Sequence, residues 1–337
     1  MQVSFIIPLF NCLPLTQAML ASLQATLPPG LAHEIILVDD DSTDGTRAWL
    51  AGLNQPVVSR SNPPPSPPAP CHVLRNEKNL GFAGACNRGA AAAAGEFLFF
   101  LNNDLVLTPH WLEPMLAAFT RFPAAGLVGN VQLNAATGAV DHAGIYFDHK
   151  GKPAHATALP RTTRWFGRPA WRPVDALTGA CFAIRRAAWR QLGGFDEGFR
   201  NGGEDVDLAL RASAAGFRHT VALRSVVRHH ISASAGRKLR DEQNTFRLVQ
   251  RWHDRIVLLA ARDWSRRQVI DHADRSGVFD YALLHAALAY LFILPAPPRL
   301  VRAGVAAALD RELQRWRELL EGAAAPPAPP SVRTDQI

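Results

Sequence analysis

The first hundred residues contain four mostly apolar runs, each bounded by turn residues. An unbroken apolar run of this length is typical of a strand that is buried on both faces of a parallel sheet. Between the apolar runs lie segments with apolar residues at helical spacing. Two of these segments are the one that follows Pro14 and residues 87–94. The runs are residues 3–9, 34–38, 71–74 and 97–101. This order predicts an α/β fold with a Rossmann-like, mostly parallel sheet that is flanked by helices.

The second half of the chain follows a less regular pattern. Residues 145–172 are rich in Lys and Arg and predict a long, mobile, basic loop, whereas 176–184 and 221–227 predict further strands. A helix is expected from Gly202 to Gly216. We therefore expect one α/β domain over residues 1–235, a helical region at 236–322 and a disordered Ala/Pro-rich tail at 323–337. A Pro-rich surface loop at 56–70 interrupts the α/β domain.

The formal net charge of +7 favours anionic partners, either nucleotide phosphates or an acidic membrane surface. The chain has no arm that is dense in Lys and Arg and interleaved with aromatic residues, so nucleic acid is not expected as a partner. The apolar run from Tyr281 to Leu294 is shorter than the ~20 residues of a spanning helix. It predicts a helix that is either buried or interfacial.

The N-terminus starts directly with an apolar strand and lacks a basic region, which predicts no signal peptide and a cytoplasmic location. The four cysteines form no CxxC pair and have no His at zinc-finger spacing. We expect buried, reduced thiols.

Three groups of acidic residues follow predicted strands or open a predicted helix. In an α/β sheet, ligands bind at the carboxyl ends of the strands. Asp39 is the better candidate in the first group for binding a base or ribose, because Ser42 and Asp44 suit the capping of a turn or helix. The segment from Asn102 to Asp104 suits either a turn or a Mg²⁺ or Mn²⁺ site.

The third acidic group lies where the helix after Gly203 begins. Asp207 is spaced to pair with Arg211, which indicates a structural role. Glu204 and Asp205 follow two glycines, and a carboxylate there could accept a proton from a hydroxyl. His229, at the end of a predicted strand, is either a metal ligand or an ordinary histidine.

Seven segments, in this order, resemble motifs of the inverting family 2 glycosyltransferases, which have the GT-A fold. The resemblance spans residues 3–235 and is strongest to the rhamnosyltransferase-like branch of polysaccharide and cell-wall assembly enzymes. The segments are Ile6 to Asn11, Val38 to Thr46, Asn79 to Gly89, Leu101 to Asp104, Thr178 to Cys181, Gly193 to Glu197 and Gly203 to Leu208.

The resemblance implies a role for each matching residue. Asp205 would be the general base with Glu204 beside it, and Asp104 would be the metal-binding acid, joined by Asn102 and His229. Asn102 stands where the DxD-type motif has its first acid, so this site would offer a cation less charge. The residues implied to bind the nucleotide-sugar are Pro8, Asn11, Asp39, Asp41, Asn79, Gly81, Phe82, Asn87, Asn103 and Gly179.

These residues predict an enzyme that transfers a sugar, with inversion, from a UDP- or dTDP-sugar to a hydroxyl of a glycan or lipid-linked acceptor. The cofactor would be Mg²⁺ or Mn²⁺, and peripheral contact with the inner face of the membrane is a further hypothesis. A non-catalytic nucleotide-sugar-binding scaffold is the alternative, supported by Asn102. A sugar nucleotidyltransferase is disfavoured, because no glycine-rich, lysine-containing phosphate loop follows the first strand.

Overall fold

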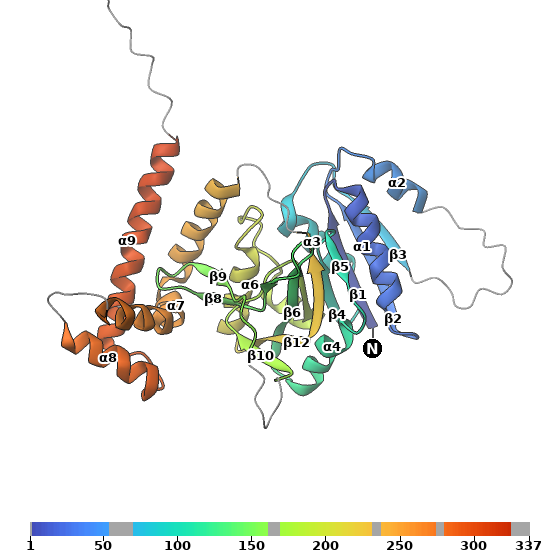
Figure 1. Ribbon diagram of the computed structural model, residues 1–337. Helices are drawn as coiled ribbons and strands as arrows, with labels where there is room; N and C mark the ends of the chain where they lie inside the picture. Colours follow the sequence, from blue (N-terminus) through green and yellow to red (C-terminus); the bar gives the residue numbers. More distant parts are fainter. Residues whose placement is uncertain (1, 54–69, 161–168, 231–236, 274–279, 325–337) are drawn as a thin grey trace, which may run out of the picture. The chain divides into compact units, whose positions relative to one another are not determined.

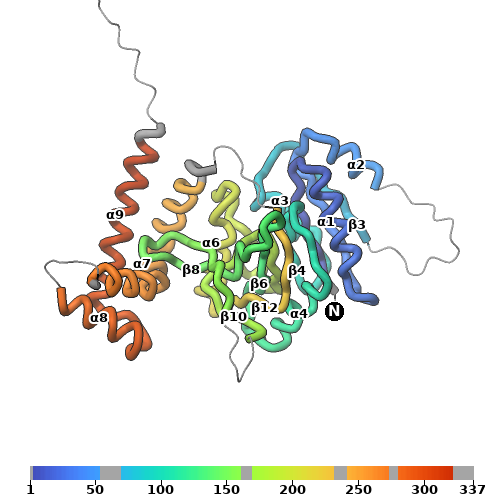
Figure 2. The backbone as a smooth tube through the Cα atoms, viewed as in Figure 1, coloured from blue at the N-terminus to red at the C-terminus, as the bar shows by residue number. Residues whose placement is uncertain are grey.

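The structure is a computed structural model that describes residues 2–53, 70–160, 169–230, 237–273 and 280–324. The chain divides into two compact units (Figures 1 and 2). The first comprises Met1–Asp148 and Lys152–Asn244, and the second comprises His149–Gly151 and Thr245–Ile337.

The first unit is built on a large sheet, which contains ten strands in the described part of the chain. Its main path has the order β10-β12-β6-β11-β4-β1-β2-β3, while β5 pairs with β12 and β7 pairs with β6. The strands are β1 Gln2–Leu9, β2 Ala32–Asp39, β3 Cys71–Arg75, β4 Phe97–Leu101, β5 Leu105–Leu107, β6 Ala125–Asn134, β7 Val140–His142, β10 Trp171–Val174, β11 Cys181–Arg185 and β12 Arg218–His229.

Strands β1 to β4 form the parallel half of this sheet. β1 pairs in parallel with β2 and with β4, and β2 pairs in parallel with β3. The apolar runs form these strands because both faces of the sheet are covered, and Phe5, Ile6 and Ile7 are all fully buried. The predicted α/β fold with a helix-flanked sheet is confirmed, and the polar residues after β1, β2 and β4 meet at one edge.

The other half of the sheet is mixed. β11 runs antiparallel to both β4 and β6, whereas β12 runs parallel to β6. Because β11 is antiparallel to β4, and β6 is antiparallel to β11, β6 runs in the same direction as β4. β12 is parallel to β6, so β6 and β12 end at the same edge of the sheet as β4. The long strand β12 therefore delivers His229 to the edge where β4 is followed by Asn102 and Asp104.

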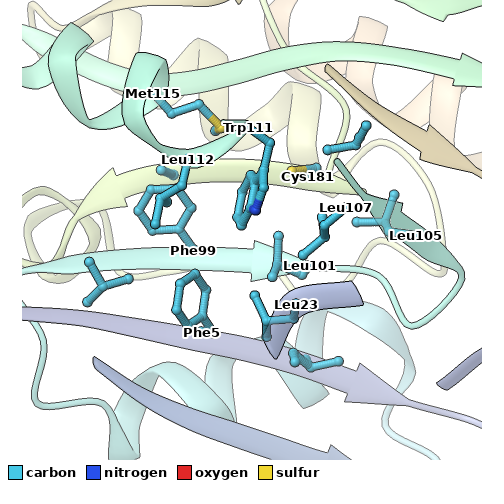
Figure 3. Packing of buried hydrophobic residues seen from close by; sticks show 14 of the residues in the cluster. Phe5, Leu23, Phe99, Leu101, Leu105, Leu107, Trp111, Leu112, Met115 and Cys181 are labelled. Carbon is cyan, nitrogen blue, oxygen red and sulfur yellow. The ribbon is translucent and has the colours of Figure 1, made fainter. Parts of the chain in front are cut away.

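Helices α1 (Leu13–Thr26) and α4 (Leu112–Arg121) cover one face of the sheet. The close-up in Figure 3 shows side chains of both helices among those of the strands: Leu112 and Met115 of α4 lie near Phe99, and Leu23 of α1 lies beside Phe5. The indole ring of Trp111 meets Phe99 edge-on at a centroid distance of 5.9 Å. This tightly packed core fixes the loops at the edge of the sheet.

Helix α3 (Gly81–Ala92) packs on strands β1 and β2. It approaches closely because Gly89 has no side chain: a Cβ there would lie 2.6 Å from Cγ2 of Ile6. The helix predicted at 87–94 begins six residues earlier than expected. The remaining helices of this unit are α2 Thr46–Leu53, α5 Arg186–Leu192 and α6 Glu204–Ala214, together with the start of α7.

The prediction of one long basic loop at 145–172 is wrong in two places. Strands β8 (Ile145–Phe147) and β9 (Pro153–His155) pair as a small antiparallel sheet, and Trp171 begins β10 at the edge of the large sheet. Residues 161–168 of this segment lie outside the described residues. The strand predicted at 176–184 is also shorter: Ala176 forms an isolated bridge with Ile145, residues 179–180 turn, and β11 begins at Cys181.

The second unit contains helix α7 (Arg237–Ala273) from Thr245 onward, α8 (Tyr281–Phe292) and α9 (Arg299–Ala324). Helices α7 and α9 form its core, in which Trp264 packs so closely on Gly304 that a Cβ there would lie 2.4 Å from the indole. No helix in the described ranges is both long enough and apolar enough to cross a membrane.

Two further predictions differ from the structure in detail. All four cysteines are free, but Cys12 and Cys71 are exposed, so the prediction of buried thiols is wrong for these two. Helix α9 continues to Ala324, two residues beyond the predicted end of the helical region. The Pro-rich segment lies outside the described residues except for Pro70, as does the tail from residue 325 onward.

Candidate active site

Asp39, the last residue of β2, is fully buried. Its Oδ1 accepts a hydrogen bond from the backbone N–H of Ser42 at 3.0 Å, and its Oδ2 lies 3.4 Å from Nε of Arg47. Arg47 also contacts Asp41 through its NH2 group at 3.0 Å. The adjacent carboxylates are thus tolerated because one arginine and the backbone amides of the turn offset their charge.

Asn11 links this turn to the end of β1. Its backbone has a positive φ of 56°, and its Oδ1 accepts the backbone N–H groups of Thr43 at 2.7 Å and Asp44 at 3.2 Å. The backbone carbonyl of Asn11 accepts a bond from Nδ2 of Asn103 at 3.3 Å. The turns after β1, β2 and β4 are therefore joined, and Pro8 lies three residues before Asn11 in β1, paired with Val38.

The predicted capping role of Asp44 agrees with its contacts. Its Oδ1 accepts the backbone N–H of Thr46, which begins α2, at 2.9 Å. Its Oδ2 accepts the backbone N–H of Leu13, which begins α1, at 3.1 Å. Burial tends to raise the pKa of the Asp44 carboxyl, but these hydrogen bonds outweigh it and the pKa is lowered.

Asp40 has a structural role that the sequence did not reveal. Its carboxylate accepts the backbone N–H groups of Leu80 at 2.8 Å and Gly81 at 2.9 Å, and the side-chain amide of Asn76 at 2.7 Å. The Nδ2 of Asn79 donates to the backbone carbonyl of Asp40 at 3.1 Å. A negative charge stabilises the start of a helix, so Asp40 explains why α3 begins at Gly81.

Asn87 and Phe82, both on α3, face the segment that precedes α6. Asn87 exchanges hydrogen bonds with the backbone of Phe195, donating at 3.0 Å and accepting at 2.9 Å, and also donates to Glu197 at 2.9 Å. The ring of Phe82 lies 5.6 Å from that of Phe195. Phe82 also borders Gly179, where a Cβ would lie 2.9 Å from the ring.

Asp205 lies in the first turn of α6 and is partly buried. Its Oδ2 accepts the backbone N–H of Gly179 at 2.7 Å, and its Oδ1 accepts that of Val206 at 2.8 Å. Burial raises the pKa of the Asp205 carboxyl above its ordinary value, against the opposing effect of these two donors and of the nearby His155. A carboxylate with a raised pKa is the better proton acceptor.

The neighbours of Asp205 support its position. Glu204 is buried, and its Oε2 accepts the backbone N–H of Gly202 at 2.7 Å. Asp207 is fully buried and pairs with Arg211 at 2.8 Å, as its spacing predicts. Arg211 also donates to the carbonyls of Leu192 and Gly194, which makes this pair a structural tie.

The structure brings Asp104 and His229 together. The Oδ1 of Asp104 lies 3.2 Å from Nε2 of His229, because β5 and β12 pair with Leu105 opposite His229. Both this Oδ1 and Nδ1 of His229 are buried; among the described residues Nδ1 has no hydrogen-bond partner, and Oδ1 has none besides its contact with Nε2 of His229. Asn102 is placed at the end of β4 by a backbone bond to Ala180.

Buried polar atoms without partners are costly, so a carboxylate and an imidazole left in this state fit a cation. Within the described ranges, no three His, Cys, Asp or Glu side chains are grouped closely enough to form a metal site. The side chains of Asp104 and His229, with the amide of Asn102 nearby in sequence, would therefore need further oxygen ligands from a substrate.

Two neighbouring histidines, of which His155 acts on Asp205, were not identified from the sequence. His142 on β7 is buried opposite Gln132 of β6, and its ring lies 4.8 Å from that of His155 on β9. Burial lowers the pKa of His142 well below its ordinary value, and the neighbouring His155, His229 and Arg172 add to this. The signal was hidden because strands β7, β8 and β9 are only three residues long each.

Residues 4–193 match the sequence pattern of Glycosyl transferase family 2. This chain belongs to that family. The match covers more than half of the chain and contains the residues that gather after β1, β2 and β4. The acids of α6 and His229 follow the matched segment.

Several relatives share part of this family 2 sequence. O-antigen biosynthesis protein RfbC of Myxococcus xanthus is 39% identical over 153 residues, which are 44% of this chain and 12% of that protein. The uncharacterized protein y4gI of Sinorhizobium fredii is 29% identical over 69% of this chain and 25% of its own length. This chain thus spans only a small part of these two relatives.

A relative of similar size and a solved structure complete the comparison. The N-acetylglucosaminyl-diphospho-decaprenol L-rhamnosyltransferase of Mycobacterium tuberculosis is 30% identical over 60% of this chain and 68% of its own. The crystal structure of GalNAc-T7 with UDP, GalNAc and Mn²⁺ superposes with a TM-score of 0.58 at 19% identity, covering 80% of this chain and 51% of that one. The fold of this family 2 glycosyltransferase is therefore GT-A.

Proposed function

We propose that this family 2 glycosyltransferase moves a sugar from a UDP- or dTDP-sugar to a hydroxyl of a glycan or lipid-linked acceptor, with inversion, in surface polysaccharide or cell-wall assembly. The transferase domain would span residues 1–235, followed by the helical region. The observation that carries the proposal is the approach of Oδ1 of Asp104 to Nε2 of His229 at 3.2 Å, in a buried position where this Oδ1 has no other partner among the described residues.

The nucleotide is proposed to bind over the joined turns after β1 and β2. Asn11 and Asp41 hold these turns through their bonds to Thr43 and Arg47. Asp39 is fully buried and is engaged by Ser42 and Arg47, so it supports the pocket by holding the turn in place. The residues proposed to bind the nucleotide-sugar, either directly or by holding the pocket in place, are Pro8, Asn11, Asp39, Asp41, Asn79, Gly81, Phe82, Asn87, Asn103 and Gly179.

A divalent cation, Mg²⁺ or Mn²⁺, would be held by Asp104 and His229, with Asn102 as a third candidate. When bound, it would offset the negative charge that develops on the departing diphosphate. The diphosphate itself would supply oxygen ligands, which a site with one carboxylate needs for a hard cation. The GalNAc-T7 complex, which contains UDP and Mn²⁺, supports this proposal.

Asp205 is proposed to act as the general base. Its carboxylate takes the proton from the acceptor hydroxyl as that oxygen attacks the anomeric carbon from the face opposite the diphosphate. The bond between the anomeric carbon and the diphosphate oxygen breaks in the same step, which inverts the configuration. The N–H groups of Gly179 and Val206 orient the carboxylate, and the buried Glu204 fixes the glycine turn beside it.

Release of the nucleotide from a panel of UDP-, dTDP- and GDP-sugars tests the proposal. We expect slow release from one donor with Mg²⁺ or Mn²⁺, which EDTA and Asp104→Ala abolish. Asp254→Ala, which removes an exposed carboxylate, is the matched control and should release nucleotide like the unmodified protein. Binding of a donor without release or transfer, even with a lipid-linked acceptor, would favour a non-catalytic scaffold.

A lipid-linked acceptor would require the enzyme to work beside a membrane. We propose peripheral contact at the inner, cytoplasmic face of the membrane, in keeping with the net charge of +7. No spanning helix is needed for such contact, since an interfacial apolar surface with basic neighbours suffices.

A further inference from the structure

The turn that joins α8 to α9 exposes apolar side chains. We name residues 292–298 together with Leu300 the apolar tip. Phe292 is 80% exposed, Ile293 81%, Leu294 41% and Leu300 50%. Isolated exposed apolar residues are ordinary, but a run of this kind at one turn indicates an interaction surface.

The second unit does not use these side chains for its own stability. Its described core contains Val301, Val305 and Leu309 of α9, all fully buried. Leu300 directly precedes this buried row and lies half exposed. Helix α8 is apolar apart from His285, yet Ala287 is its one fully buried residue among the described residues. The apolar surface of α8 and the tip is therefore available for a partner.

The backbone of the tip suits a medium that contains little water. The N–H groups of Ile293 and Leu294 both donate to the carbonyl of Ala289, at 2.8 and 2.7 Å. Pro295, Pro297 and Pro298 have no N–H group to satisfy. Unpaired N–H groups make insertion into lipid costly. This turn has few such groups, which lowers that cost.

The charge around the tip selects the kind of partner. Between Asp280 and Asp310, the sequence has two charged residues, Arg299 and Arg302, and both are exposed. Arginines beside an apolar surface complement the anionic headgroups of a membrane. A symmetric contact with a second copy would bring the same arginines of both chains together, which is less favourable.

We infer that the apolar tip inserts into the interface of a membrane that contains anionic phospholipids. Phe292, Ile293 and Leu294 enter the boundary between headgroups and acyl chains, while Arg299 and Arg302 contact the phosphates. This assigns a surface and a lipid class to the membrane contact and rests on that part of the proposed function, but not on sugar transfer.

Flotation of the full chain with vesicles tests this inference. The unmodified protein is expected to float with vesicles of phosphatidylcholine and phosphatidylglycerol in equal parts, and less with phosphatidylcholine alone. The double variant F292S/I293S should lower the partition coefficient about 100-fold, since each buried side chain contributes about tenfold or more. Its matched control is I270S/L319S, which replaces two exposed apolar residues outside the tip.

The arginines are tested separately. R299Q/R302Q should weaken binding to the anionic vesicles about 30-fold, and leave binding to neutral vesicles unchanged, because each arginine contributes about fivefold near an anionic surface. R255Q/R266Q removes two exposed arginines of α7 and should change neither. High salt should reproduce the effect of R299Q/R302Q.

Three results would overturn the inference: no flotation of the unmodified protein, equal loss in the control variants, or concentration-dependent dimerisation that F292S/I293S abolishes without any vesicle binding. The last result would assign the tip to a second copy. Unchanged thermal unfolding excludes misfolding of the variants. Donor cleavage in solution should be the same in all of them, so failure of vesicle binding is distinguishable from failure of the proposed transfer.

Discussion

Replacing Asp205 by asparagine separates proton transfer from substrate binding. The amide has nearly the same shape and can still accept one of the two N–H groups, from Gly179 or Val206, that hold the carboxylate. It cannot take a proton from an acceptor hydroxyl. A general base contributes about 10²- to 10⁴-fold, so we expect kcat to fall by that factor. This corresponds to about 3–5 kcal/mol in the activation free energy.

The assay for Asp205→Asn is transfer to an acceptor, measured together with donor binding by titration calorimetry. Donor affinity should stay within about threefold, because the carboxylate acts on the acceptor side, and a threefold change is well below 1.4 kcal/mol. For the unmodified enzyme, kcat/KM should rise with pH through the raised pKa of Asp205, since the base must be ionised. A variant that keeps more than a tenth of the transfer rate would refute the assignment of Asp205 as the base.

Three further predictions follow from the same geometry. His155→Gln removes a positive charge that lowers the pKa of Asp205, so the acid limb of kcat/KM should move to higher pH; an unmoved limb contradicts this. His229→Gln should weaken Mn²⁺ binding in the presence of nucleotide at least about tenfold by calorimetry, whereas the exposed His110 replaced by Gln should not. Asp207→Ala leaves Arg211 without its buried partner and should cost about 3 kcal/mol, or about 10 °C in Tm, by calorimetric unfolding. An unchanged Tm would contradict a structural role for Asp207.

Some structural features were not visible in the sequence because their parts lie far apart along the chain. Asp40 determines where α3 begins, but it acts on Leu80 and Gly81, about forty residues away. Asn87 similarly exchanges hydrogen bonds with Phe195, more than a hundred residues later. Local spacing rules describe helix caps from adjacent residues and carry no signal for such contacts.

Short strands were missed for a different reason. Strands β7, β8 and β9 contain three residues each, too few for an alternating pattern to be recognised. Their segment therefore resembled a loop, and neither the contact of His142 with His155 nor the effect of His155 on Asp205 could be predicted. Their positions depend on the pairing of β7 with β6 and of β8 with β9.

The sequence alone determined the parallel half of the sheet and the polar residues that follow its strands. Mostly apolar runs identify strands β1, β2 and β4 because burial on both faces leaves few polar positions, and polar residues at their ends mark the edge where a ligand is expected. It also placed Asp207 beside Arg211, since the helix repeat brings residues four apart together.

Only the tertiary structure decided how the second half completes the site. The reversals at β11 and β6 return β12 to the direction of β4, and this brings His229 within 3.2 Å of Asp104 across 125 residues of sequence. Strand order and direction result from the packing of the whole core. The free energy of that packing is shared among many residues, so no single motif specifies it.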